Sequence, residues 1–402
     1  MYYFKSIMVN MLNLFLYFFT KLFFRKKQKW VFGSWYGEKY FDNTKYLYEY
    51  ILKNHSKIDA IWICKDKKIV DKINSNGGKA FIYGSFKANY HVATSKFVFM
   101  TQKYLDVAPL YLIGGAVKVQ LWHGVAFKKI GYDSFEIKKS FLRKINQEIQ
   151  NLLFKYDIHI ASSEEYKSKL ATAFKIHKNS IIDVGQPRND ILFDNKYIIN
   201  KKSEILEQLK NKYNIKLENK KIITYLPTFR DKKIVSFDFS KLNQSDNQKL
   251  VEILQKYNSV IIQKSHYVDS KDENSISNNK YILNLDSASD IDTQELMLST
   301  DILITDYSSC YFDFLLLNRP IVHYLYDYHE YKNNDRGLYY SIDEAKGGAV
   351  SYKFEELLIC IENYLKDETL DESIRKNATE KFINYEDGKS SEKIFDYVSK
   401  MI

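Results

Sequence analysis

The sequence predicts an α/β fold made of two doubly wound parallel sheets. Short apolar runs alternate with segments of helical spacing from residue 30 onward, and many of these runs are continuously apolar. Continuous apolar runs are typical of strands that helices cover on both faces. One stretch between Asp194 and Lys221, rich in Lys, Asn and Glu, interrupts the alternation. Since a chain of 402 residues can hold two separate cores, we expect two domains divided near residue 200.

The first domain is expected to span residues 30–200 and the second residues 201–402, with the last helix either staying in the second domain or packing back on the first. The candidate strands of the first half are Trp30–Gly33, Ile58–Cys64, Ala80–Tyr83, Phe97–Thr101, Val117–Leu121, Ile158–Ala161 and Ile181–Val184, with helical spacing in Asp42–Asn54 and Phe141–Lys155. Those of the second half are Ile222–Leu226, Val260–Gln263, Tyr281–Asn284, Ile302–Thr305 and Ile321–Tyr324. The expected helices there are Ser203–Tyr213, Gln248–Tyr257, Thr293–Leu298, Tyr311–Leu317, Phe354–Lys366 and Asp371–Phe382.

Residues 1–29 form a separate N-terminal segment. Its longest uninterrupted apolar run, Leu14–Phe19, is far shorter than the roughly 20 residues that cross a bilayer, and no signal-peptide cleavage site is visible. We therefore expect an amphipathic helix on an anionic membrane surface, with its cations near the head groups. A helix packed on the protein's own core and a true span are the alternatives. The cations that follow the apolar residues are Arg25, Lys26, Lys27 and Lys29.

The composition is that of a globular protein with excess positive charge. Aromatic residues make up 16% of the chain, which argues against disorder, and the formal net charge is +10. This charge fits an anionic membrane surface or a phosphate-rich substrate, and because no nucleic-acid-binding motif accompanies it we expect no nucleic-acid partner. Cys64, Cys310 and Cys360 lack C-x-x-C spacing, which excludes a disulfide framework and fits a reducing compartment.

Polar clusters follow the predicted strands, at the carboxyl ends where doubly wound sheets bind ligands. His123 follows a buried strand and precedes Gly124, so it is a candidate general base near neutral pH; a packed structural turn is the alternative. Arg188 can clamp a phosphate, and Lys264 and His266 can address one anionic group. Turns with solvated charges are the alternatives for both clusters.

The stretch Asp301–Leu317 contains a further candidate site. It predicts a buried strand that turns into a helix at Ser308 and Ser309. Free backbone N–H groups, the positive end of the helix dipole and two hydroxyls would meet there, so the turn suits a phosphate or pyrophosphate. An N-capping serine pair on an ordinary helix is the alternative. Pro227 and Thr228, also at a strand end, are placed to line a nucleobase or ribose.

The sequence gives no sign of a metal site or a bound cofactor. Neither half carries a dinucleotide fingerprint, a P-loop or a nucleophile elbow. The histidines His159, His177, His323 and His329 lack the spacing of metal ligands. We therefore expect no cofactor, and no divalent metal is indicated.

Six motifs occur in order and resemble one known family. They are W-H-G-x-x-x-K-K-I-G, G-x-P-R-N-D, P-T-F-R-D, K-x-H, I-T-D-Y-S-S-x-x-F-D-F-L-L-L-x-x-P-I and R-G-x-Y. Their order and spacing resemble the CDP-glycerol glycerophosphotransferase family, whose members build wall teichoic acids and related capsules in bacteria. The resemblance covers roughly Trp30 to Leu365, although Val125 and Ala126 stand where the family commonly has Thr-Pro. It implies a GT-B architecture, with two Rossmann-like domains facing a central cleft and the nucleotide in the C-terminal one.

The resemblance also implies roles for the matching positions. His123 corresponds to the base that deprotonates the acceptor hydroxyl, and His266 is a second catalytic residue that helps to hold the donor diphosphate. Asp313 would reach the ribose or polyol of the donor, and it lies four residues after Ser309, so both can occupy one helix face. The implied donor-binding set is Trp122, Gly124, Arg188, Pro227, Thr228, Lys264, Ser308, Ser309 and Asp313.

The implied reaction is transfer of a polyol phosphate, most simply glycerol phosphate, from a CDP-polyol to a hydroxyl of a lipid-linked saccharide or polyol-phosphate acceptor, with release of CMP. We expect a peripheral enzyme at the cytoplasmic face of the plasma membrane. A CDP-ribitol ribitolphosphotransferase and a GT-B glycosyltransferase that uses a nucleotide sugar are the nearest alternatives. A sugar-binding protein with an inactive site is a third. The polyol, the acceptor and the number of units added stay open at this point.

Overall fold

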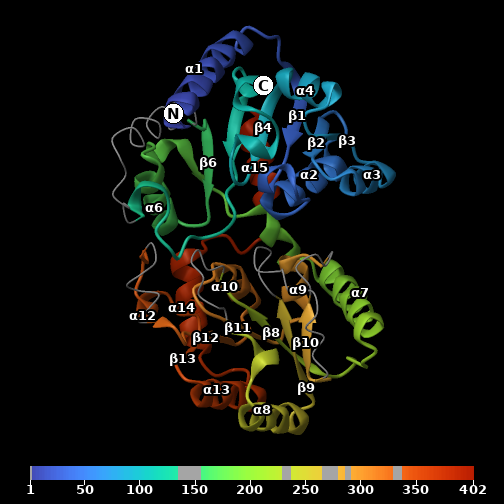
Figure 1. Ribbon diagram of the computed structural model, residues 1–402, viewed down its shortest axis with the longest axis vertical. Helices are drawn as coiled ribbons and strands as arrows, with labels where there is room; N and C mark the ends of the chain where they lie inside the picture. The colour runs from blue at the N-terminus through green and yellow to red at the C-terminus, as the bar shows by residue number, and fades with distance from the viewer. Residues whose placement is uncertain (1, 135–154, 229–236, 265–278, 286–290, 329–336) are drawn as a thin grey trace. The chain divides into compact units, whose positions relative to one another are not determined.

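The structure, a computed structural model, describes residues 2–134, 155–228, 237–264, 279–285, 291–328 and 337–402 (Figure 1). The chain forms two compact units. Unit 1 comprises Met1–His123, Glu136–Asp190 and Asp387–Ile402, and unit 2 comprises Gly124–Phe135 and Ile191–Glu386. Gly124–Phe135 thus belongs with unit 2, and the end of the chain belongs with unit 1, which is one of the two positions expected for the last helix. The predicted helix Phe141–Lys155 lies almost wholly outside the described residues.

A parallel sheet of seven strands forms the centre of unit 1, in the order β3-β2-β1-β4-β5-β6-β7. This is the doubly wound order, in which the direction of winding reverses between β1 and β4. All seven predicted strands are confirmed, although β1 begins at Lys26 rather than Trp30. The strands are β1 (Lys26–Phe32), β2 (Asp59–Cys64), β3 (Ala80–Ile82), β4 (Ser95–Met100), β5 (Val117–Gln120), β6 (Ile158–Ala161) and β7 (Ile181–Asp183).

Apolar side chains cover both faces of this sheet, because successive residues of a strand point to opposite sides. Phe32, Trp62 and Phe99 pack on one face with α2, α3 and α15, whereas Val31 and Val98 pack on the other with α4 and the end of α1. The continuously apolar strands are thus buried on two sides, as predicted. The helices of unit 1 are α1 (Tyr2–Thr20), α2 (Asp42–Asn54), α3 (Lys67–Ser75), α4 (Phe86–Ala93), α6 (Glu164–Phe174) and α15 (Ser390–Ser399).

The sheet of unit 2 has six parallel strands in the order β10-β9-β8-β11-β12-β13, which repeats the doubly wound pattern with its reversal between β8 and β11. The five predicted strands are confirmed, and β13 is an additional three-residue edge strand too short to give a periodic signal. The strands are β8 (Lys221–Leu226), β9 (Ser259–Lys264), β10 (Ile282–Leu285), β11 (Ile302–Thr305), β12 (Ile321–Tyr324) and β13 (Ala349–Ser351).

Three predicted helices of unit 2 differ from the structure, and α12 was not predicted. Helix α8 begins at Gln244 rather than Gln248, where the Asn243 side chain caps it by accepting from the Asp246 N–H at 2.9 Å. Helix α7 begins at Asn195 rather than Ser203, because the Asp194 carboxylate caps it by accepting from the Tyr197 N–H at 2.9 Å. The predicted helix Tyr311–Leu317 is a five-residue α-helix, α10, followed by a 3₁₀ turn. The helices are α7 (Asn195–Tyr213), α8 (Gln244–Lys256), α9 (Thr293–Ser299), α10 (Cys310–Phe314), α12 (Ile342–Ala345), α13 (Phe354–Lys366) and α14 (Glu372–Phe382).

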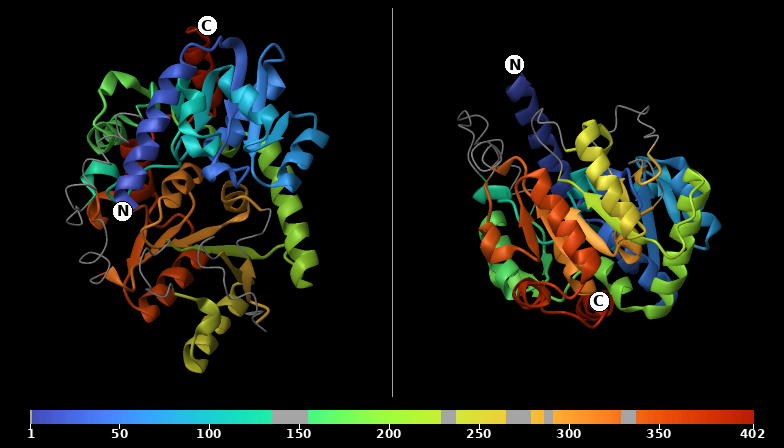
Figure 2. Two further views of the ribbon diagram at one scale, coloured as in Figure 1. Left: turned by 45° about the horizontal axis from the view of Figure 1, so that its top comes forward. Right: turned by 90° about the horizontal axis from the view of Figure 1, so that it is seen from below.

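Helix α1 lies on the outside of unit 1 and attaches to it by one side (Figure 2). Tyr17 and Thr20 are buried, and the Lys118 ammonium donates to the Tyr17 hydroxyl at 3.1 Å. The other side carries exposed large apolar side chains. Among the described helices none is long and apolar enough to cross a membrane. The exposed apolar residues of α1 and the turn after it are Met11, Leu12, Phe15, Phe18, Phe19, Leu22, Phe23 and Phe24.

The basic residues after α1 do not all point to solvent, contrary to a simple cationic flank. Arg25 donates to the backbone carbonyls of Val92 and Leu112 at 2.9 and 3.2 Å, and Lys29 is 3% exposed. Lys26 and Lys27 are exposed. Half of the predicted cationic flank therefore serves the packing of unit 1.

Candidate active site

The predicted site residues fall into two groups, one in each unit. His266 lies outside the described residues. Trp122, His123 and Arg188 belong to unit 1, and Gly124, Pro227, Thr228, Lys264, Ser308, Ser309 and Asp313 belong to unit 2.

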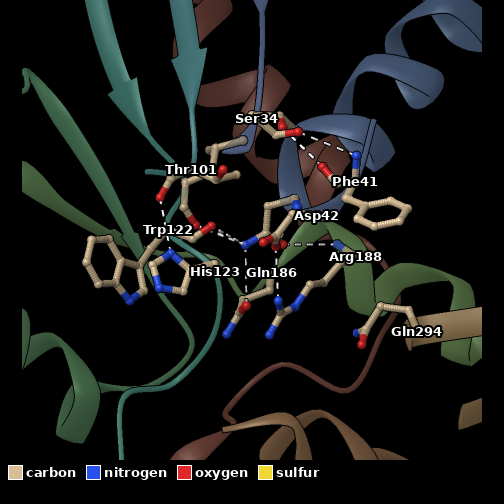
Figure 3. A network of polar contacts seen from close by, with 12 residues as sticks. Ser34, Phe41, Asp42, Thr101, Trp122, His123, Gln186, Arg188 and Gln294 are labelled. Carbon is tan, nitrogen blue, oxygen red and sulfur yellow. Dashed lines mark hydrogen bonds and ion pairs between the residues drawn. The ribbon is translucent and has the colours of Figure 1, made fainter. Parts of the chain in front are cut away.

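His123 follows β5 and is held by a backbone carbonyl of the neighbouring strand end. Its Nδ1 lies 3.3 Å from the Thr101 carbonyl oxygen, after β4 (Figure 3). Because a carbonyl oxygen only accepts, Nδ1 carries the hydrogen in the neutral ring and Nε2 keeps its lone pair. This is the tautomer that a general base needs. Trp122 stacks on the imidazole with ring centroids 4.2 Å apart.

The surroundings favour the neutral form of His123. Burial lowers the pKa of His123, while the Asp42 carboxylate and the Thr101 carbonyl oppose that effect and Arg188 adds to it. The imidazole is therefore unprotonated at neutral pH and can accept a proton.

Three residues around His123 adopt left-handed backbone conformations that are uncommon for their type. Trp35, Asp42 and Trp122 have φ of 48°, 70° and 53°. The Trp35 ring lies 6.4 Å from the His123 ring, and its indole N–H donates to the Asp42 carboxylate at 3.3 Å. Backbone strain of this kind persists only where the surroundings hold it, and it gathers at functional sites.

A buried ion pair lies beside His123. Arg188, after β7, donates to Asp42 at 3.0 Å, and the two side chains are only 10% and 5% exposed. Asp42 is the first residue of α2, so the pair joins the loops that follow β1 and β7 (Figure 3). The structure thus gives Arg188 a carboxylate partner within unit 1, and its predicted contact with a donor phosphate stays a prediction.

The buried Asp106 carboxylate organises the strand ends at the winding reversal of unit 1. It accepts from the backbone N–H of Tyr36 at 2.7 Å and of Thr101 and Gln102 at 2.8 Å. Burial raises the pKa of Asp106 to about 6, and these N–H bonds act against that effect. Gly33 is required here, because a Cβ would meet the Asp106 carbonyl oxygen at 2.2 Å. This arrangement fixes the Thr101 carbonyl that orients His123.

In unit 2 the P-T and T-D-Y-S-S motifs are joined at the winding reversal between β8 and β11. The Thr228 N–H donates to the buried Asp306 carboxylate at 2.8 Å, and the Thr228 hydroxyl donates to the same oxygen. The Thr305 hydroxyl donates to the Leu226 carbonyl at 2.7 Å. The carboxyl end of a reversal point is where such sheets bind nucleotides.

The serine turn differs from the prediction in one respect. Ser308 and Ser309 are partly exposed after β11, and Ser309 makes no side-chain capping bond, so the capping alternative is not what this hydroxyl does. The α-helical part after the turn, however, has five residues, and its dipole is correspondingly small. A phosphate bound at this turn would therefore meet hydroxyl and N–H donors rather than a strong helix dipole. Asp313 on this helix is 1% exposed, and its donor contact stays a prediction.

Lys264 ends β9, the strand beside β8, and its ammonium donates to the Ile291 carbonyl at 2.5 Å.

The R-G-x-Y motif, to which the sequence assigns no role, pairs with the segment after Gly124. The Tyr339 hydroxyl donates to the Asp133 carboxylate at 2.8 Å, and the backbone N–H of Tyr339 donates to the Phe127 carbonyl at 2.9 Å. This motif therefore positions the K-K-I-G segment within unit 2.

Two further histidines are buried and neutral. Burial lowers the pKa of His159 and of His323 to about 4, and His323 Nε2 accepts from the Gly347 N–H at 3.0 Å. In the part of the chain that the structure describes, no group of three or more His, Cys, Asp or Glu residues is arranged to hold a metal ion.

Two doubly wound parallel sheets, with a histidine at one set of strand ends and hydroxyl donors at the other, are an arrangement that nucleotide-dependent group-transfer enzymes can use. The sequence profile described as CDP-Glycerol:Poly(glycerophosphate) glycerophosphotransferase matches residues 15–400. The chain belongs to this family. The predicted family, the transferase class and the α/β fold with two parallel sheets are thereby confirmed.

Individual relatives agree with the family. The chain is 29% identical over 394 residues to a teichoic acid poly(glycerol phosphate) polymerase of Bacillus spizizenii, with 92% of both chains covered. It is 29% identical over 384 residues to the teichoic acid glycerol-phosphate transferase of Staphylococcus aureus, again with 92% of both covered. Among solved structures, a variant of the wall teichoic acid polymerase TagF soaked with CDPG has a TM-score of 0.77 at 25% identity, covering 100% of this chain and 98% of that one.

Proposed function

We propose that the protein transfers glycerol phosphate from CDP-glycerol to a hydroxyl of a teichoic acid acceptor, with release of CMP. Membership of the family supports the donor and the reaction type. The observation that carries the chemistry is His123, whose Nδ1 faces a carbonyl and whose Nε2 is left to accept a proton.

In the proposed reaction the acceptor oxygen attacks the phosphorus that bears glycerol. A new oxygen–phosphorus bond forms, the bond from that phosphorus to the bridging oxygen of the diphosphate breaks, and CMP leaves with the electron pair. His123 Nε2 takes the proton of the acceptor hydroxyl. Such a transfer needs positioning and charge stabilisation more than covalent catalysis, and we assign those tasks to unit 2.

Most donor-binding residues of the proposal lie at neighbouring strand ends of unit 2. Thr228 follows β8, Lys264 ends β9 and the Ser308–Ser309 turn follows β11, and these three strands are adjacent and parallel. The Ser308 and Ser309 hydroxyls and the Lys264 ammonium suit a diphosphate, whereas Thr228, whose hydroxyl donates to Asp306, is assigned to the nucleobase or ribose. His266, Arg188 and Asp313 complete the proposed set by their motif positions.

The donor assay tests this function directly. The protein is incubated separately with CDP-glycerol and with CDP-ribitol. Each donor is combined with a lipid-linked saccharide acceptor and with a polyol-phosphate acceptor, and the product masses are determined by mass spectrometry. We expect CMP release and glycerol phosphate addition, at least ten-fold faster than ribitol phosphate addition. Equal or faster use of CDP-ribitol would overturn the choice of polyol. No CMP release from either donor, together with release of a nucleoside diphosphate in a parallel incubation with a nucleotide sugar, would identify a glycosyltransferase instead.

Donor affinity tests the serine turn separately. Replacing Ser308 and Ser309 by alanine removes two hydroxyl donors, each hydrogen bond to a charged group being worth about 1.5–3 kcal/mol. The variant should therefore bind CDP-glycerol more weakly, measured by calorimetry. Unchanged affinity would place the diphosphate elsewhere.

We also propose peripheral attachment to the cytoplasmic face of the plasma membrane through α1. The support is the row of exposed apolar side chains, among them Phe15 at 70% and Phe18 at 55%, next to the exposed cations Lys21, Lys26 and Lys27. Apolar residues beside cations suit an interface of anionic lipids. Attachment would place the enzyme beside a lipid-linked acceptor.

Vesicle binding checks the attachment. Replacing Phe15 and Phe18 by glutamate should weaken binding to phosphatidylglycerol vesicles by about 100-fold, because burial of each Phe contributes roughly 1.5–3 kcal/mol. The matched control changes Phe86 and Ile359, which are 87% and 59% exposed on other helices, to glutamate. Sedimentation with vesicles that is equal for the two variants would refute attachment through α1.

A further inference from the structure

The backbone of Trp122, directly before His123, is held from both sides by buried side-chain amides. Its N–H donates to the Gln120 side-chain oxygen at 2.9 Å, and its carbonyl accepts from the Asn43 amide nitrogen at 3.1 Å. Gln120 is 1% and Asn43 is 0% exposed. Both peptide groups that flank the left-handed Trp122 are therefore fixed.

Both ends of the Asn43 side-chain amide are hydrogen-bonded at this point. The amide nitrogen also donates to the Leu121 carbonyl at 3.0 Å and to the Gln186 side-chain oxygen at 3.3 Å. Its carbonyl oxygen accepts from the Arg188 N–H at 3.2 Å. One buried amide thus ties the start of α2 to the loops that follow β5 and β7.

We propose that Asn43 is a positioning residue that sets the direction of the His123 side chain. It does so by binding the Trp122 carbonyl and thereby holding the Trp122 backbone in its left-handed conformation. This inference rests on the proposed role of His123 as the base. A bulky residue at a φ of 53° costs of order 1–3 kcal/mol and returns to an ordinary conformation when its restraints are removed. That return would rotate the peptide between Trp122 and His123 and move the imidazole away from the Thr101 carbonyl.

The test is Asn43→Ala, with steady-state kinetics and an NMR titration of the His123 ring, assigned by comparison with His123→Gln. We expect kcat to fall about 100-fold, the effect of a misplacement near 1 Å, with a much smaller change in the KM for CDP-glycerol. The pKa of His123 should rise toward the ordinary value of about 6.5 as the ring becomes more exposed to solvent. Asn54→Ala, at the exposed end of the same helix, is the matched control and should change neither quantity.

The outcomes separate the possible roles. A lower melting temperature with normal kcat and a normal His123 titration would show that Asn43 only stabilises the fold and would overturn the proposal. Full activity of His123→Ala would refute the base role, whereas the NMR titration would still report whether Asn43 orients the ring. If Asn43→Ala does not fold, Gln120→Met removes the opposite restraint on Trp122. Like Asn43→Ala, this variant should lower kcat and raise the pKa of His123. If neither quantity changes, the proposal is overturned.

Discussion

Replacing His123 by alanine should lower kcat by about 10²–10⁴-fold and leave the affinity for CDP-glycerol nearly unchanged. The reason is that His123 belongs to unit 1 and is oriented by Thr101, whereas the proposed diphosphate ligands other than Arg188 belong to unit 2. Single-turnover kinetics with saturating donor measure the first quantity, and calorimetry with CDP-glycerol measures the second.

The pH profile gives an independent check on the same residue. A base must be unprotonated, so kcat/KM should fall as the pH drops through the pKa of His123. Burial lowers that pKa, so the acid limb should lie below 6.5, the ordinary value for histidine. The Asp42 carboxylate raises the pKa of His123, so Asp42→Asn should move the acid limb to still lower pH.

His177→Ala is the matched control, because His177 is an exposed histidine of unit 1 outside the site. It should leave kcat and the acid limb unchanged. A loss of donor affinity in His123→Ala equal to the loss of kcat, or an acid limb that persists in that variant, would contradict the role of His123 as the base.

The fold was largely predictable because its strands are short, continuously apolar and buried on both faces. Ile158–Ala161, Ile302–Thr305 and Ile321–Tyr324 begin and end where the pattern places them. The exceptions have local causes. Helix α7 extends back to a capping aspartate within a polar segment, and β13 has only the three residues Ala349–Ser351. Neither segment has a periodic arrangement of apolar residues from which it could be predicted.

The candidate site was predictable only in part. Residues placed directly after strands, such as His123 and Thr228, stand out because the carboxyl ends of parallel strands meet at one edge. Asn43 and Asp106 did not stand out, because one opens a helix and the other lies in a 3₁₀ turn. Both residues bind backbone groups that are distant in sequence and that only folding brings close. The sequence does not distinguish them from other polar residues. The signal available was the D-N pair at the start of α2, which reads equally well as an ordinary helix start.

Replacing Arg188 by methionine should lower the free energy of unfolding by about 3–5 kcal/mol, because it leaves the Asp42 carboxylate buried without its cation. The pair is 3.0 Å apart, with side chains 10% and 5% exposed. Chemical denaturation measures the loss. Lys376→Met is the matched control, since it breaks an exposed pair with Glu372 at 2.8 Å and should cost roughly 0.5 kcal/mol or less.

The double variant Arg188→Met with Asp42→Asn separates stability from donor binding. It removes both charges, and asparagine tolerates the left-handed φ at position 42, so most of the lost stability should return. If Arg188 also binds the donor diphosphate, as its motif predicts, the restored protein should still bind CDP-glycerol more weakly than the wild type. Wild-type affinity in that variant would instead assign Arg188 to the support of unit 1 alone. A single variant as stable as the wild type would contradict the buried ion pair itself.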